Sequence, residues 1–121
     1  MGNFASVNPE QFQRTSEQEI YKSIILNHFS LCMRLGTEAT NRDSCLHFER
    51  AIKMLEAAVS HRISDTYQKI VTDISAEGAD AFKNNDIHGF YETLRLRFMI
   101  IVQELSFLGY MPEERAIDVL E

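Results

Sequence analysis

The sequence predicts an all-α fold: an antiparallel four-helix bundle with a short fifth helix at its C-terminal end and a loose N-terminal arm. Three observations lead to this prediction. Apolar residues recur at steps of three and four along most of the chain, as one face of a helix requires. No segment alternates apolar and polar residues with the period of two that is typical of a half-buried strand. The segments between the periodic stretches are short, which makes neighbouring helices antiparallel.

The first helix follows a segment without periodicity. We therefore expect a flexible arm over residues 1–14 and a single helical domain over residues 15–121. The helix is expected to begin near Ser16, which has the spacing of a capping box with Glu19. It is expected to end at Gly36, because glycine adopts the left-handed conformation common after helices. Its apolar face contains one stripe and a second beside it: Ile20, Ile24, Leu31 and Leu35, then Tyr21, Ile25, His28 and Cys32, with Phe29 widening the face.

The second helix has the clearest pattern in the chain. Asn41 or Thr40 can cap its first turn, because each side chain offers an oxygen to a free backbone N–H group. Five apolar residues follow at steps of three and four: Cys45, Phe48, Ile52, Leu55 and Val59. Four charged residues are expected to face solvent: Glu49, Arg50, Lys53 and Glu56.

The third helix is expected to begin at Ser64 and Asp65. Its apolar residues are Tyr67, Ile70, Val71 and Ile74, followed by Gly78, Ala81 and Phe82. Because glycine weakens a helix interior by about 1 kcal/mol relative to alanine, we expect a frayed end over residues 76–86.

The fourth helix is expected to run from a cap at Asp86 to Gly109 and to form the centre of the bundle. Apolar residues surround most of its circumference: Phe90, Leu94, Phe98, Ile101, Leu105 and Leu108, then Tyr91, Leu96, Met99, Ile100, Val102 and Phe107. Such a helix is buried on several sides. The other helices offer one main face each, so we expect apolar surface to remain for another protein. After Met111, Pro112 begins the short fifth helix, which presents Ala116, Ile117 and Leu120.

Composition and charge exclude several classes of protein. The chain has 121 residues, of which 45% are hydrophobic and 25% charged, as in an ordinary globular domain. The net charge is −6, which disfavours sequence-independent nucleic-acid binding. We expect no membrane span, because no apolar run is long enough. We expect a cytoplasmic protein, since there is no secretory signal and two cysteines do not make a disulfide framework. The first residues match the short N-myristoylation pattern at Gly2, but no polybasic segment follows.

Three side chains form the sharpest chemical candidate. His28 and Cys32 are four residues apart and share a helix face. An antiparallel hairpin would bring Cys45 to the level of Cys32. The functional interpretation is a metal site or a redox pair, and thus a metal- or thiol-dependent sensor or enzyme. The alternative is a core histidine with two small buried thiols, which the missing fourth ligand and the lack of a CxxC motif favour.

A second candidate lies on the fourth helix. Arg95 and Arg97 follow Tyr91 by about one turn, and this combination can grip phosphate and stack a base. Two arginines on a helix expected to be buried are weak evidence, so a nucleic-acid-binding regulator remains an alternative only. The chain contains no P-loop, GxGxxG, GxSxG or HExxH motif, and no Glu-x-x-His pair of the di-iron type.

The sequence therefore predicts a small non-enzymatic helical interaction module, an adaptor, regulator or assembly factor. We expect it to associate with a second copy, as a dimer, or with another protein, through apolar helix faces. No catalytic residue and no cofactor are expected. Six residues are expected at the interface: Phe4, Phe12, Tyr91, Met99, Ile117 and Leu120.

Overall fold

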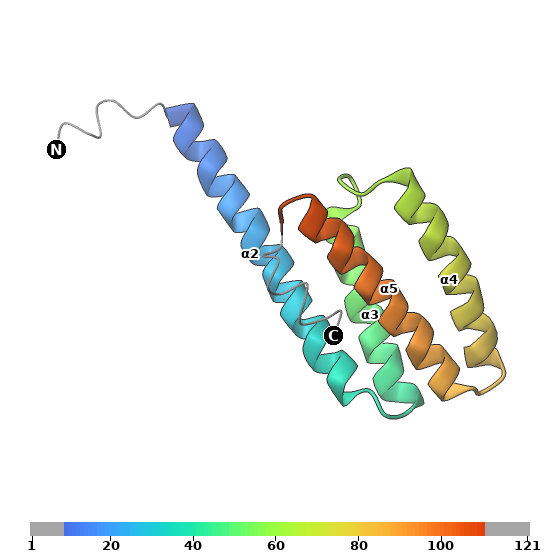
Figure 1. Cartoon of the computed structure of the whole chain (residues 1–121). Helices are drawn as coiled ribbons and strands as arrows, with labels where there is room; N and C mark the ends of the chain where they lie inside the picture. Colours follow the sequence, from blue (N-terminus) through green and yellow to red (C-terminus); the bar gives the residue numbers. More distant parts are fainter. Residues whose placement is uncertain (1–8, 111–121) are drawn as a thin grey trace.

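The computed structural model describes the backbone of residues 9–110 and the side chains from Glu17 onward. Over this range the chain is all-helical and compatible with the predicted bundle (Figure 1). Its four helices are α2 (Pro9–Glu38), α3 (Arg42–Val59), α4 (Asp65–Lys83) and α5 (Ile87–Phe107). The predicted fifth helix, in residues 111–121, lies outside the described residues. In the described part of the chain, no helix has the length and apolar character needed to cross a bilayer.

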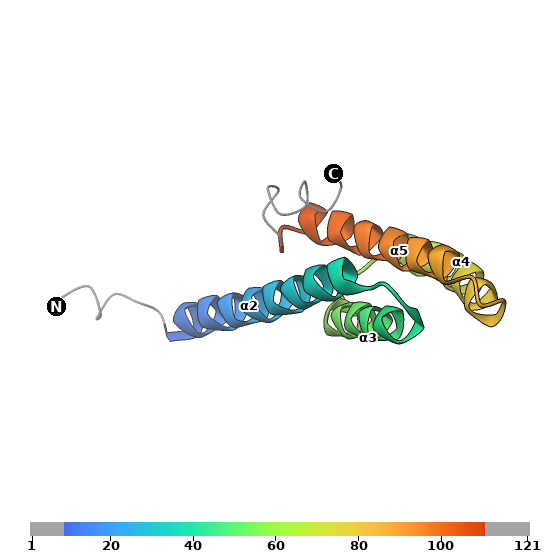
Figure 2. The same ribbon diagram turned by 90° about the horizontal axis from the view of Figure 1, so that it is seen from below.

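The helices pack in the spatial order α2, α3, α5, α4. Figure 2 shows α2 and α3 in one layer and α5 and α4 in a second. α2 also meets α5, because the rings of Phe29 and Phe98 lie 5.7 Å apart between centroids. Phe48 of α3 meets Phe98 edge to face at 6.0 Å. These three rings join α2, α3 and α5 around one core, and full burial of each is worth roughly 1.5–3 kcal/mol.

Local signals in the sequence correctly predict the starts of α3, α4 and α5 and the end of α5. Asn41 accepts from the Ser44 N–H group while the Ser44 hydroxyl accepts from the Asn41 N–H group, so the two form a capping box at the start of α3. Ser64 and Asp86 cap α4 and α5 in the expected places. Gly109 has a φ of 83°. Beyond it, the N–H of Tyr110 donates to the carbonyl of Leu105 at 2.9 Å, which closes α5 as a Schellman motif.

Two glycines lie inside helices, contrary to the expectation that Gly36 ends the first helix and that the third helix frays from residue 76. α2 continues through Gly36 to Glu38, and α4 continues through Gly78 to Lys83. A Cβ on Gly36 would lie 2.9 Å from the ring of Phe48, and one on Gly78 would lie 2.8 Å from Oγ1 of Thr93. Both glycines therefore allow a neighbouring helix to approach closely.

The start and the buried face of α2 also differ from the prediction. α2 begins at Pro9 rather than near Ser16, because proline suits the first helical turn and no strong helix breaker follows it. The N-terminal turns extend past the ends of α3 and α5 (Figures 1 and 2). The buried stripe contains Ile25, Phe29 and Cys32, whereas Ile20 and Ile24 are exposed. Leu31 and Leu35, the other members of the stripe that contains Ile20 and Ile24, are partly buried against the core.

Candidate interaction surface

α5 packs against α3 and α4 and also meets α2, yet the described part of the chain does not cover it completely. Seven of its residues are buried: Phe90, Leu94, Arg97, Phe98, Ile101, Val102 and Leu105. On the remaining side, Leu96 is 45% exposed and Phe107 is 94% exposed. The sequence predicted this surplus of apolar surface from the distribution of apolar residues around the helix.

The uncovered apolar residues follow one side of α5. Leu96, Ile100 and Phe107 are separated by four and seven residues, which places them on one face of the helix. Met99 lies beside them, and it and Ile100 are partly buried against the core. We call Leu96, Met99, Ile100 and Phe107 the α5 outer surface.

α4 extends the α5 outer surface with one more exposed apolar residue. The N–H of Ser64 donates to Oε1 of Glu104 at 3.2 Å, and Gly78 lies against Thr93. These two contacts fix the antiparallel register of α4 and α5, and this register places Ile70 at the level of Ile100. Ile70 is exposed and shares a helix face with Glu77, which lines a hollow with Leu96 and Met99. The apolar area therefore spans two helices.

Charged side chains of both signs border the α5 outer surface. A hollow of about 430 Å³ is lined by Glu77, Glu92, Thr93, Arg95, Leu96 and Met99. Its acidic side chains come from both α4 and α5, and its one basic side chain, Arg95, comes from α5. An apolar strip bordered by mixed charges has the make-up of a protein interface, with an apolar centre and a polar rim.

The predicted contact residues have different positions. Met99 lines the hollow and belongs to the α5 outer surface. Tyr91 makes contacts within the chain: its hydroxyl donates to the carbonyl of Gly36 at 3.0 Å, and its ring lies 6.1 Å from that of Phe48. The structure does not describe the side chain of Phe12. Three other predicted contact residues lie outside the described residues: Phe4, Ile117 and Leu120.

A buried ion pair between Arg97 and Glu56 was not predicted from the sequence. Nε of Arg97 donates to Oε2 of Glu56 at 3.0 Å, and Nη2 donates to Oε1. The hydroxyl of Tyr67 donates to the same Oε2 at 2.8 Å. Burial raises the pKa of this hydroxyl, and the negative charge of Glu56 raises it further. The expectation that Glu56 faces solvent is therefore wrong, and the inward side of the bundle is not wholly apolar.

The positions of the apolar residues around Glu56 and Arg97 could have indicated that both side chains face the core. Glu56 lies four residues after Ile52 and three before Val59, which are both buried. Arg97 lies three residues after Leu94 and four before Ile101, which are also buried. A charged residue with buried neighbours one turn away on both sides faces the core, and two such residues of opposite sign on different helices are a candidate pair.

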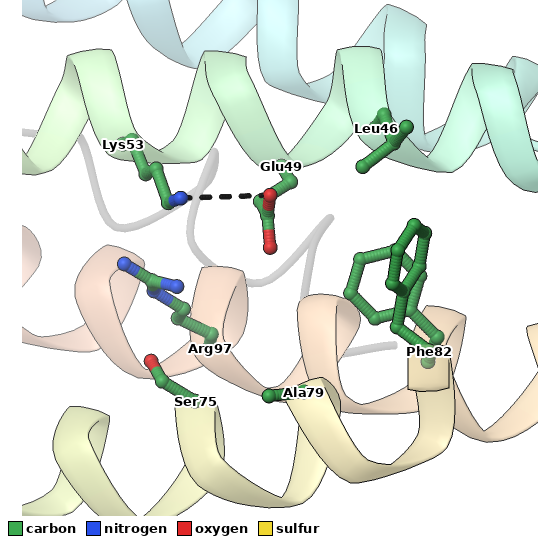
Figure 3. A pocket seen from close by; sticks show the side chains of 8 residues that line it. Leu46, Glu49, Lys53, Ser75, Ala79, Phe82 and Arg97 are labelled. Carbon is green, nitrogen blue, oxygen red and sulfur yellow. Dashed lines mark ion pairs between the residues drawn. The ribbon is translucent and has the colours of Figure 1, made fainter. Parts of the chain in front are cut away.

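An open cavity of about 320 Å³ lies between α3, α4 and α5 next to this pair. Eight residues line it: Leu46, Glu49, Lys53, Ser75, Ala79, Phe82, Phe90 and Arg97. Figure 3 shows Lys53 and Arg97 on opposite sides of the same space, with Ser75 below them. Nζ of Lys53 lies 3.5 Å from Oε1 of Glu49. At the other end of the cavity, the rings of Phe82 and Phe90 meet edge to face at 5.1 Å.

The two thiols are buried and do not form a disulfide. Burial raises the pKa of the Cys32 thiol to about 12, with a smaller contribution from the charge of Glu56. Burial also raises the pKa of Cys45. Since the thiolate is the reactive and metal-binding form, these raised pKa values disfavour thiol chemistry at neutral pH. Among the described side chains, no three His, Cys, Asp or Glu residues come together as metal ligands, and His28 is only partly buried.

The two arginines of the nucleic-acid alternative are separated by burial. Arg95 is exposed, whereas Arg97 is buried and bonded to Glu56. Only Arg95 is therefore free to meet a phosphate group at the surface. No known protein family, curated protein or solved structure shows detectable similarity to this chain.

Proposed function

We propose that this protein is a non-enzymatic helical interaction module that associates through the α5 outer surface, and that a second copy of the chain is its first partner. The observation behind the proposal is the exposure of Phe107 and Leu96 on the helix that otherwise forms the centre of the core. Contiguous exposed apolar side chains bordered by polar ones mark protein interaction sites. The role that follows is that of an adaptor, regulator or assembly factor.

The charges beside the α5 outer surface favour a second copy over an unrelated partner. A two-fold dimer pairs each surface with itself, so every charged group needs an opposite charge within the same patch. The patch supplies this pairing: Arg95 of one copy can meet Glu92 or Glu77 of the other. Such pairs at the rim set the register of the contact, while Leu96 and Phe107 provide the buried area.

A matched pair of variants tests the proposal. Leu96→Glu combined with Phe107→Glu places charges in the apolar strip, where burial without a partner is costly. Size-exclusion chromatography with light scattering should give a dimer for the unsubstituted chain and a monomer for this variant, with self-association weakened at least about 100-fold. The control is Met54→Glu on α3, because Met54 is 52% exposed and lies away from the α5 outer surface. If the control dissociates as readily, or if the double variant remains dimeric, the proposal is wrong.

A further inference from the structure

The cavity between α3, α4 and α5 divides into a polar and an apolar end, and each end is formed by more than one helix. Lys53 of α3, Ser75 of α4 and Arg97 of α5 form the polar end (Figure 3). Phe82 of α4 and Phe90 of α5 form the apolar end. The volume of about 320 Å³ falls within the range of small-molecule sites.

Arg97 is the fixed group of the polar end. Its bonds to Glu56 use Nε and Nη2, which leaves Nη1 of the planar guanidinium for another acceptor. The side chain is only 11% exposed, so the Glu56 carboxylate and the surrounding helices hold its orientation. A buried and oriented guanidinium can bind a carboxylate without first losing much conformational freedom.

Lys53 is the movable group of the polar end. Its ion pair with Glu49 is long, and the lysine side chain is 58% exposed. Exposed pairs four residues apart on a helix contribute little, so Lys53 can turn to another anion at small cost. Lys53 and Arg97 are each paired with a carboxylate, Glu49 and Glu56, so the charges of the polar end balance before a ligand binds. The Ser75 hydroxyl, which also lines the cavity, adds a hydrogen-bond donor.

We infer that this cavity binds a small amphiphilic monocarboxylate, with its carboxylate between Lys53 and Arg97 and its hydrocarbon part against Phe82 and Phe90. Hydrogen-bond donors of Lys53, Ser75 and Arg97 at one end and apolar surface at the other select this ligand class. The cavity lies within one chain, so this inference does not depend on self-association. It is also distinct from the hollow beside the α5 outer surface, with which it shares no lining residue.

The test uses octanoate and its neutral analogue octan-1-ol as probes of the full chain. Isothermal titration calorimetry should show octanoate binding at least ten times more tightly than octan-1-ol, because only octanoate engages the cationic end. In two-dimensional NMR spectra, octanoate should shift the amide signals of Leu46, Ser75 and Ala79. No saturable octanoate binding, or equal affinity for the two probes, would overturn the inference.

Two matched substitutions locate the binding. Ala79 lines the cavity and Ala76 does not, and both are exposed on α4. Ala79→Leu fills the cavity and should weaken octanoate binding at least tenfold, whereas Ala76→Leu should leave it unchanged. Lys53→Gln should weaken octanoate binding about tenfold without changing that of octan-1-ol, and the control Lys69→Gln should change neither. If octanoate binds Ala79→Leu as tightly as it binds the unsubstituted chain, its site lies outside this cavity and the inference is wrong.

Discussion

Arg97 and Glu56 place two charges in a region that is largely apolar. Their burial affects the free energy of unfolding when either residue is replaced. Their side chains are 11% and 12% exposed, so water solvates neither group well. Removing one partner of a buried pair leaves an unpaired charge and costs about 3–5 kcal/mol, whereas replacing both with apolar residues is much less harmful. We therefore expect the pair to favour one arrangement of α3 against α5 more than it adds to stability.

The corresponding prediction compares single and double variants. Arg97→Met should lower the free energy of unfolding by about 3 kcal/mol, because it leaves the Glu56 carboxylate buried without its cation. Adding Glu56→Leu should recover part of that loss, because the charge is removed but the hydroxyl of Tyr67 loses its acceptor. Urea unfolding followed by circular dichroism measures both values. A double variant that is less stable than the single one would show that the pair stabilises the fold outright.

Cys32 gives a prediction about alkaline pH. In the unfolded chain its thiol loses a proton near its ordinary pKa of 9.0, but in the folded chain it does so only at a pKa of about 12. Above pH 9 the folded state therefore holds more protons than the unfolded state, so stability falls as pH rises. One such group contributes up to about 1.4 kcal/mol per pH unit.

We therefore expect Cys32→Ala to reduce the slope of unfolding free energy against pH between pH 9 and pH 10. In this window the tyrosines, whose ordinary pKa is 10.0, contribute less. Comparing slopes rather than absolute stabilities removes the cost of the lost side chain itself. Equal slopes in the two proteins would show that Cys32 titrates normally in the folded chain.

At the scale of the element, the correct predictions have a local cause, although the local capping-box spacing of Ser16 and Glu19 does not mark the start of α2. The caps at Asn41, Ser64 and Asp86 and the end at Gly109 depend on residues within a few positions, and the sequence showed all of them. The function of Gly36 depends on a ring from another helix, which no local pattern contains. The same reason explains why the sequence did not reveal which apolar stripe of α2 is buried.

The prediction at the scale of the element concerns the substitution of Gly36 by alanine. Gly36→Ala gains about 1 kcal/mol of helix propensity, but its Cβ would lie 2.9 Å from the Phe48 ring. Overpacking of this kind costs about 1–3 kcal/mol, so we expect net destabilisation in thermal unfolding. In a Phe48→Leu background the clash is absent and Gly36→Ala should stabilise the protein. An identical effect in both backgrounds would exclude the close approach as the cause.

At the scale of the whole molecule, the sequence predicted that α5 has more apolar surface than its neighbours cover, and Leu96 and Phe107 are exposed accordingly. Of the residues it placed at an interface, Met99 lies in the α5 outer surface, because an apolar residue can be placed on a helix face by counting. The sequence did not show that Tyr91 packs within the chain, because its hydroxyl donates to the carbonyl of Gly36, which is 55 residues away in the sequence. The cavity was not predictable either, because its lining comes from three helices.

The most direct test of the central claim, that the α5 outer surface is completed by a second copy, is sedimentation equilibrium of the unsubstituted chain over a range of concentrations. The chain has a mass of 14.0 kDa. The account predicts a single monomer–dimer equilibrium that approaches twice this mass at high concentration. A mass that stays at 14.0 kDa throughout would contradict it.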